Sequence, residues 1–423
     1  MSKMDERLDA IIFGATGFTG KIVMEDAVNI FKDLKWGIAG RNEGKLKQVL
    51  KEVGEKAGKD LSNIPIIVAD VSDEASVENM AKKCKIVLNC CGPYRFYGET
   101  VVKACIAAGT HHVDISGEPQ YIDKMQLDYN DLAQEKGVYV VSSCAYESIP
   151  AEIGVVFAEK NFPGTVNSVE LFWENELNYQ DKTSKAILNS GTWDSVVFAL
   201  QYIFEMMRLQ YKLNRGNMPT LRPKLRLKLF PHKSEGLDSY FIPFPNTDRA
   251  SVLRSQRLAY DMEKKRPIQF EIYKGFKSCW TAFKLPFYLF FLTIMAQFSC
   301  TRNLLLKHPK YFTNGLMSPE GPVAANRKSL EFNMTFKAKG WTKGSDESLP
   351  PNKEVIVRLT GNDPCYGFSS GSLLSCAKVI LQEHKNMPES GGVIPPGIAF
   401  AKTQLIEELT RNISGLKFEV VKL

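Results

Sequence analysis

Short apolar segments alternate with longer amphipathic segments over the first third of the chain. The apolar segments, each of four to six residues, predict strands, and the segments between them repeat apolar residues at the spacing of a helix. The predicted strands are 8–13, 36–39, 64–69, 86–90, 112–115 and 138–142, and the predicted helices are 21–34, 43–57, 73–84, 99–108 and 119–135. This alternation predicts an α/β fold with a Rossmann-type doubly wound parallel sheet, because crossover helices cover both faces of such a sheet.

The pattern changes after residue 148, which sets the expected end of a first domain, 1–148. A second α+β domain with an antiparallel sheet is expected over 149–364. Its predicted helices are 149–160 and 192–213, and its predicted strands are 167–173, 268–274, 330–338 and 354–359. Two further helices, 369–383 and 398–411, and a last strand at 416–421 are also expected.

Composition narrows the class of protein. With 423 residues, 44% hydrophobic and 24% charged, the chain has the composition of a globular protein of two or more domains. The nine cysteines are scattered without a C-x-x-C pair, and the five histidines include no H-x-x-x-H pair. We therefore expect neither a disulfide framework nor a metal site. The polar N-terminus lacks the apolar region of a secretory signal, so we expect an intracellular, cytoplasmic protein.

The charge is distributed unevenly along the chain. Residues 208–310 hold 20 Lys and Arg against 6 Asp and Glu, which indicates an anionic partner, either nucleic acid or lipid head groups. The longest apolar run, 285–298, lies inside this basic region and is shorter than the ~20 residues that span a bilayer. We favour a lipid droplet or membrane surface, bound through 274–310, over nucleic acid. The alternatives for this run are the core of the second domain or a homodimer interface.

A glycine-rich segment joins the first predicted strand to the first helix. It reads Gly14-Ala15-Thr16-Gly17-Phe18-Thr19-Gly20. The first glycine permits a tight turn, the second lets the backbone approach a pyrophosphate, and the third lets the helix pack close to the sheet. The predicted dinucleotide contacts in this loop are Gly14, Thr16, Gly17, Phe18, Thr19 and Gly20. The alternative, a glycine-rich turn without a ligand, is disfavoured by the position after the first strand.

The second and third strands predict which dinucleotide is bound. An NAD enzyme places an acidic residue at the end of the second strand to bind the ribose 2′-hydroxyl, and this chain has Arg41 there. An arginine pairs with a 2′-phosphate, so we expect NADP(H) to be preferred over NAD(H). Asp70 closes the third strand, where it either contacts the adenine edge or caps the next helix.

The loops after the fourth and fifth strands supply the candidate catalytic residues. Cys91, Gly92 and Pro93 are expected to line the nicotinamide end of the crevice. Tyr94 is the candidate proton donor, and Asp114 is the candidate group that orients the substrate. The alternatives are that Tyr94 packs the loop and that Asp114 is a cap or turn residue. A cysteine nucleophile is disfavoured because no base is identifiable beside it.

These motifs together resemble the saccharopine dehydrogenase-like oxidoreductases. The matching segments are 14–20, 39–42, 89–94, 113–118, 146–150 and 361–364. The resemblance implies a Rossmann domain completed by C-terminal helices in 365–412, with the second α+β domain inserted between the two parts. Saccharopine reductases carry a G-L-D-P-G-like motif after the sixth strand, whereas this chain reads Y-E-S-I-P at 146–150. That departure argues against an amino-acid substrate.

Related bacterial proteins of the branch resemble trans-acting enoyl reductases, and eukaryotic ones are associated with lipid droplets. The resemblance therefore implies an NADP(H)-dependent oxidoreductase that acts on a lipid-like or other apolar small molecule at a lipid droplet or membrane surface. Two alternatives stay open. One is imine reduction on an amino acid, and the other is a non-catalytic cofactor-binding scaffold or redox sensor, which the absence of a clear general acid supports.

Overall fold

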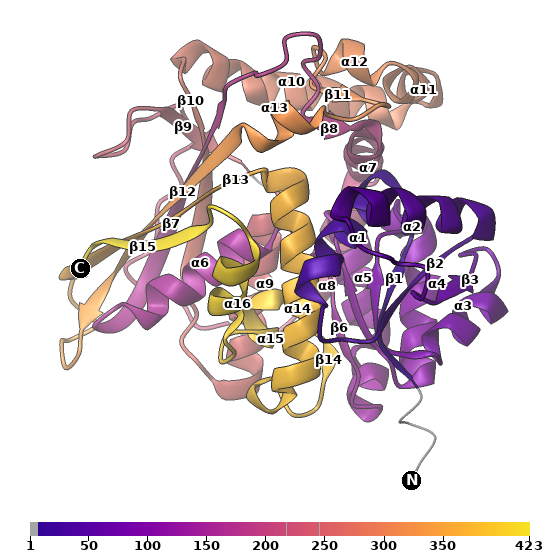
Figure 1. Ribbon diagram of the computed structural model, residues 1–423. Coiled ribbons are helices and arrows are strands. Elements are labelled where there is room, and N and C mark those ends of the chain that lie inside the picture. The colour runs from indigo at the N-terminus through magenta and orange to yellow at the C-terminus, as the bar shows by residue number, and fades with distance from the viewer. Residues whose placement is uncertain (1–6, 217, 245) are drawn as a thin grey trace. The chain divides into compact units, whose positions relative to one another are not determined.

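The computed structural model describes residues 7–216, 218–244 and 246–423. These residues form two compact units (Figure 1). The first unit holds the described residues up to Tyr146 together with Cys365–Ile413, and the second holds Glu147–Pro364 with Ser414–Leu423. The expected α/β class, with a Rossmann-like unit and a second unit of its own, is confirmed.

Seven strands of the described chain form the parallel sheet of the first unit. They are β1 (Leu8–Phe13), β2 (Trp36–Gly40), β3 (Ile66–Val68), β4 (Cys84–Asn89), β5 (His111–Asp114), β6 (Tyr139–Val141) and β14 (Gly392–Val393). The strand order is β14-β6-β5-β4-β1-β2-β3, and every neighbouring pair is parallel. The direction of the strand order reverses between β1 and β4, and ligands of doubly wound folds bind at that point.

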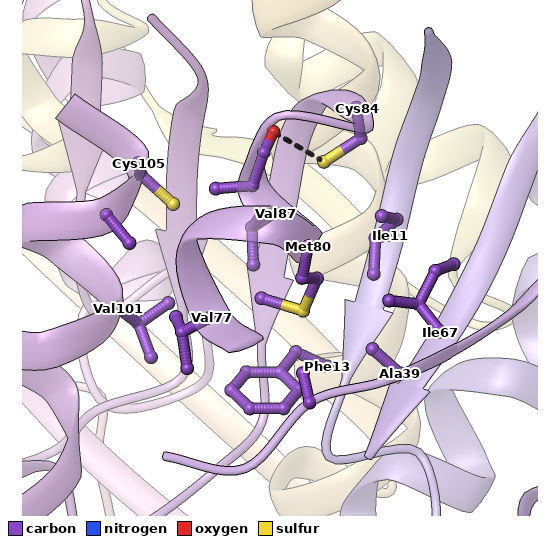
Figure 2. Close-up of a cluster of buried hydrophobic side chains, with 13 residues drawn as sticks. Ile11, Phe13, Ala39, Ile67, Val77, Met80, Cys84, Val87, Val101 and Cys105 are labelled. Atoms are coloured by element: carbon purple, nitrogen blue, oxygen red, sulfur yellow. Dashed lines mark hydrogen bonds between the residues drawn. The ribbon is translucent and has the colours of Figure 1, made fainter. Parts of the chain in front are cut away.

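Helices of the first unit pack on this sheet in two groups. One group contains α1 (Phe18–Ile30), α2 (Glu43–Ala57) and α14 (Ser369–Glu383), and the other contains α3 (Glu74–Ala81), α4 (Tyr94–Ala108) and α5 (Pro119–Glu135). Figure 2 shows the core under α3 and α4, where Val77 and Met80 pack against Ile11 and Val87 of the strands. The core aligns the carboxyl ends of β1 and β4 for the loops that follow them.

The end of the first unit differs from the expectation of one helix over 398–411. The chain forms α15 (Pro396–Ala399) and, after a turn, α16 (Leu405–Asn412). Thr403 makes the turn, because its hydroxyl donates to the Phe400 carbonyl at 2.9 Å and accepts the Leu405 N–H at 3.3 Å. A local side-chain hydrogen bond of this kind competes with a continuous helix.

The sheet of the second unit is mixed. Its order is β15-β13-β12-β7-β10-β9, formed by β7 (Gly164–Leu177), β9 (Tyr240–Pro243), β10 (Gln269–Phe276), β12 (Leu330–Thr342), β13 (Lys353–Asn362) and β15 (Lys417–Lys422). The antiparallel expectation is wrong for β7 and β10, which pair in parallel. The segment between these two strands, 178–268, is long enough for the crossover connection that a parallel pair requires. A two-stranded pair of β8 (Leu188–Asn189) and β11 (Met317–Ser318) lies apart from this sheet.

Helices α6 (Ile149–Lys160) and α9 (Thr247–Glu263) pack on each other, and α6 also contacts β12 and β13. The predicted helix 192–213 is two helices, α7 (Ser190–Gln201) and α8 (Ile203–Leu213), because the backbone leaves the helical conformation at Tyr202. The two helices differ in how deeply they are buried. Helix α7 buries Trp193 and Val197, whereas no residue of α8 is buried.

The apolar run expected at 285–298 belongs to a longer helix, α10 (Cys279–Gln297), which continues through Pro286. By length and composition alone this helix is long and apolar enough to cross a membrane, and 22% of that stretch is buried. One side of α10 packs on α7, where Leu292 and Met295 join a core with Trp193. The helices α11 (Ser299–Lys307), α12 (Pro309–Phe312) and α13 (Ala324–Lys328) follow it along the chain.

Candidate cofactor site

The connection from β1 into the first turn of α1 leaves no room for side chains at two glycines, Gly14 and Gly20. Gly14 has a φ of +86°, and a Cβ there would lie 2.8 Å from Cys91 Sγ. A Cβ on Gly20 would lie 2.2 Å from the Gly14 carbonyl oxygen. Glycine is therefore required at both positions by the packing of the turn against β4 and by the entry of α1.

The N-terminus of α1 has the features of an anion site. The helix begins at Phe18 after Gly17, no side chain caps this end, and its first turn contains no acidic residue. Thr16 and Thr19 are half-buried in the same turn, Gly17 is exposed, and the Phe18 ring meets the edge of the Tyr366 ring at 5.0 Å between centroids. Uncapped N–H groups and the positive end of the helix dipole attract phosphate groups, so this end fits a pyrophosphate.

Arg41 lies directly beyond β2 and is exposed. Within the part of the chain that the structure describes, its guanidinium makes no hydrogen bond or ion pair. Asp70, beyond β3, accepts hydrogen bonds from the backbone N–H and hydroxyl of Ser72, which together with the charge of Arg41 lower the pKa of Asp70. The cap of α3 is Asp73 instead, so the alternative role of Asp70 as a helix cap is wrong.

The loop after β4 brings Cys91 to the same edge of the sheet. Burial raises the pKa of the Cys91 thiol to about 12. The charge of Arg41 opposes this rise, and the charge of Asp70 adds to it. Burial likewise raises the pKa of the Cys90 thiol. A protonated thiol is a poor nucleophile, which agrees with the expectation that neither cysteine attacks a substrate. Gly92 and Pro93 complete the loop through a cis peptide bond and lead into α4.

Unlike α1, helix α4 has its N-terminus filled by a carboxylate from a distant loop. Glu118 accepts the Tyr94 N–H at 3.0 Å and the Arg95 N–H at 2.9 Å, and its side chain is buried. Sequence analysis missed this role, because a cap from 24 residues away leaves no local pattern. The N-terminus of α4 is therefore satisfied inside the protein.

Tyr94 is buried, and its hydroxyl donates to the Asn89 carbonyl oxygen at 2.9 Å. Burial raises the pKa of Tyr94 well above its usual range. The Tyr94 ring packs against Tyr121, whose hydroxyl donates to Asp114 Oδ2 at 3.0 Å. The structure therefore brings Tyr94 and Asp114 close together through Tyr121.

Asp114 is fully buried at the end of β5, and both of its carboxylate oxygens are occupied. Oδ1 accepts the N–H groups of Ser116 and Ser143 at 3.0 and 2.9 Å, and Oδ2 accepts the Ser142 hydroxyl at 2.9 Å in addition to Tyr121. These bonds join the loops after β5 and β6. A catalytic role for Tyr94 and Asp114 stays a prediction, and their contacts favour holding these loops in place.

The sequence of this chain is similar to known proteins, first of all in the unit that contains this edge. Residues 10–141 match the family described as the saccharopine dehydrogenase NADP binding domain. The chain is 34% identical over 420 residues to a Homo sapiens saccharopine dehydrogenase-like oxidoreductase, an alignment that covers 97% of this chain and 96% of the relative. It is 36% identical over 420 residues to a Caenorhabditis elegans lipid droplet localized protein, with 95% and 96% covered.

One solved structure has the same overall fold. Apo saccharopine dehydrogenase (L-Glu forming) from Saccharomyces cerevisiae matches with a TM-score of 0.52, covering 98% of this chain and 100% of that one. At 13% identity this likeness shows the fold alone. The glycine turn, the open end of α1 and the nearly full-length relatives lead to one conclusion: the chain belongs to the saccharopine dehydrogenase-like oxidoreductases, with a family NADP-binding domain in its first unit.

Proposed function

We propose that this protein is an oxidoreductase that uses NADP(H) in preference to NAD(H) and acts on an apolar, lipid-like substrate at the surface of a lipid droplet or membrane. In this proposal the open N-terminus of α1 holds the pyrophosphate, and Arg41 pairs with the 2′-phosphate. The bound nicotinamide supplies hydride chemistry. In this proposal the dinucleotide also lies beside Asp70 and the Cys91–Pro93 loop, which follow β3 and β4 at the same edge of the sheet.

The observation that carries the lipid part of this proposal is the outward side of α10. Trp280, Phe287 and Phe290 are 62%, 63% and 67% exposed there. Exposed apolar surface of this kind marks a binding surface for a protein or a membrane. The cations of 274–310 flank this helix, and the name of the C. elegans relative places that protein on lipid droplets.

The apolar side of α10 can be tested without disturbing the core. The variant Phe287→Ser/Phe290→Ser/Phe291→Ser changes side chains that are all more than half exposed, so it should keep the parent's melting temperature and NADPH binding. It should no longer bind droplets or vesicles. The matched control Leu292→Ser changes a side chain 1% exposed on the packed side and should lower stability by about 2–4 kcal/mol. A triple variant that unfolds and loses NADPH would show that the segment belongs to the core.

A second candidate function is a cofactor-binding protein without turnover. It is favoured by the contacts of Tyr94 and Asp114, whose polar groups are already bonded inside the first unit. NADPH consumption separates the candidates. Consumption with acyl lipids supports the proposed reductase, consumption only with an amino acid plus a keto acid supports imine reduction, and binding with no consumption supports the scaffold.

A further inference from the structure

Residues 222–233, which we call the basic strap, form an irregular segment of the second unit that is fixed to its sheet. The Pro223 carbonyl oxygen accepts the side-chain amides of Asn167 at 3.0 Å and Gln269 at 2.9 Å. The Leu225 N–H donates to Gln269 Oε1 at 2.8 Å. Further along, the Lys228 ammonium lies 2.9 Å from a carboxylate oxygen of Glu170 on β7. The fold therefore determines which side chains the strap presents.

The strap presents two adjacent apolar side chains to the solvent. Leu229 is 66% exposed and Phe230 is 75% exposed, and Leu227 nearby is also exposed. Apolar side chains held outward by a fixed backbone lose the free energy that burial would provide. Such a pair indicates a surface that is buried against a binding partner when the protein functions.

The strap also presents cations that have no partner. The side chains of Arg222, Lys224 and Arg226 are exposed, and none makes a hydrogen bond or ion pair with the residues that the structure describes. The sequence of 222–233 contains no acidic residue. Three unpaired positive charges a few residues from an exposed Leu-Phe pair match the chemistry of an anionic phospholipid surface, with phosphates at the charges and acyl chains at the apolar pair.

We propose that the basic strap is a second lipid-binding element that recognises anionic head groups, separate from α10. It rests on the proposed function in one respect, namely that the protein works at a lipid surface. Helix α10 presents mainly apolar area, with the cations of 274–310 beside it. The strap adds affinity only where the surface is negative, and this added affinity falls as salt screens the charges.

The strap is tested with the full chain and vesicles of phosphatidylcholine, with or without phosphatidylserine. The variant Arg222→Gln/Lys224→Gln/Arg226→Gln should bind the phosphatidylserine vesicles about 100-fold more weakly, because each cation at an anionic surface contributes about fivefold. Its binding to phosphatidylcholine alone and to NADPH should not change. The matched control Lys32→Gln/Lys83→Gln/Lys385→Gln removes the same charge from exposed lysines of the first unit and should bind both vesicles like the parent.

Four outcomes would overturn the proposal. The first is parent binding that is the same with and without phosphatidylserine and at low and high salt, a result that needs no variant to be folded. The second is an equal loss in the strap variant and the control, which would assign the effect to net charge. Binding of the parent to an acidic peptide or to nucleic acid but not to vesicles would assign the strap to another partner. Loss of vesicle binding only on changing α10 would leave the proposed function intact without the strap.

Discussion

Two helices of the first unit, α1 and α4, follow neighbouring strands of one sheet but differ in how their N-termini are capped. Helix α1 has no side-chain cap and no acidic residue in its first turn, whereas the first two N–H groups of α4 donate to Glu118. Both ends carry the same positive partial charge of the helix dipole. The difference teaches where an anionic ligand belongs: at the helix end whose donors the protein leaves unsatisfied.

The largest expected effect comes from closing the glycine turn. Gly20→Ala places a methyl group 2.2 Å from the Gly14 carbonyl oxygen, so α1 has to move and its open end is lost. We expect no measurable NADPH binding by fluorescence titration. The control Gly109→Ala meets no atom within 4 Å and should cost only about 1 kcal/mol of stability, because of its positive φ. Normal NADPH binding by Gly20→Ala would contradict the role of this turn.

Giving α1 a carboxylate cap should make its N-terminus resemble that of α4. In Gly17→Asp the new carboxylate lies at the N-cap of α1, where it accepts the helix N–H groups and repels phosphates. We expect NADPH affinity to fall about 100-fold, close to 3 kcal/mol. Gly17→Ala adds the same Cβ without the charge, so equal losses in both variants would show that space, and not the open helix end, matters.

Removing the cap of α4 should affect stability more than cofactor binding. Glu118→Ala leaves the N–H groups of Tyr94 and Arg95 without their acceptor in a buried place. We expect the free energy of unfolding to fall by about 3 kcal/mol in urea denaturation, since hydrogen bonds to a charged group contribute about 1.5–3 kcal/mol each. Glu118→Gln keeps one acceptor and should lose less. An unchanged unfolding midpoint for Glu118→Ala would remove Glu118 as a cap.

A smaller effect separates a structural from a catalytic role for Asp114. Asp114→Asn keeps the size of the side chain but turns one acceptor oxygen into a donor within a fully occupied set of partners. We expect a loss of about 2 kcal/mol of stability, measured by urea denaturation. A variant with the stability of the parent but without NADPH consumption would instead make Asp114 a catalytic residue.

The sequence predicted the first unit well, because the strands and helices of this unit are determined by residues that are close together in the sequence. The strand at Leu8–Phe13 and the helices Glu43–Ala57 and Pro119–Glu135 were predicted with their observed bounds. The glycine turn was identified because the three glycines meet a strand and a helix at fixed spacing.

What the sequence did not predict depends on contacts between distant segments. Glu118 reaches α4 from the loop after β5, and the parallel pairing of β7 with β10 joins segments about a hundred residues apart. A surface position for 274–310 was favoured from the sequence, but the packed and outward sides of α10 were not told apart, because apolar residues occupy both sides. The exposure of Leu229 and Phe230 in the basic strap could not be predicted either. Their side chains are of the kind found in a core, and they are exposed because hydrogen bonds to distant residues fix the strap to the sheet.

The most direct test of the open end of α1 as an NADP(H) site is the affinity of the parent for NADPH and for NADH. Arg41 makes no hydrogen bond or ion pair with the described residues, and a charge-assisted bidentate contact with a 2′-phosphate contributes about 1.5–3 kcal/mol. We predict that NADPH binds about 10–150-fold more tightly than NADH, and that Arg41→Asp removes or reverses the preference. Equal affinity of the parent for the two nucleotides would contradict the account.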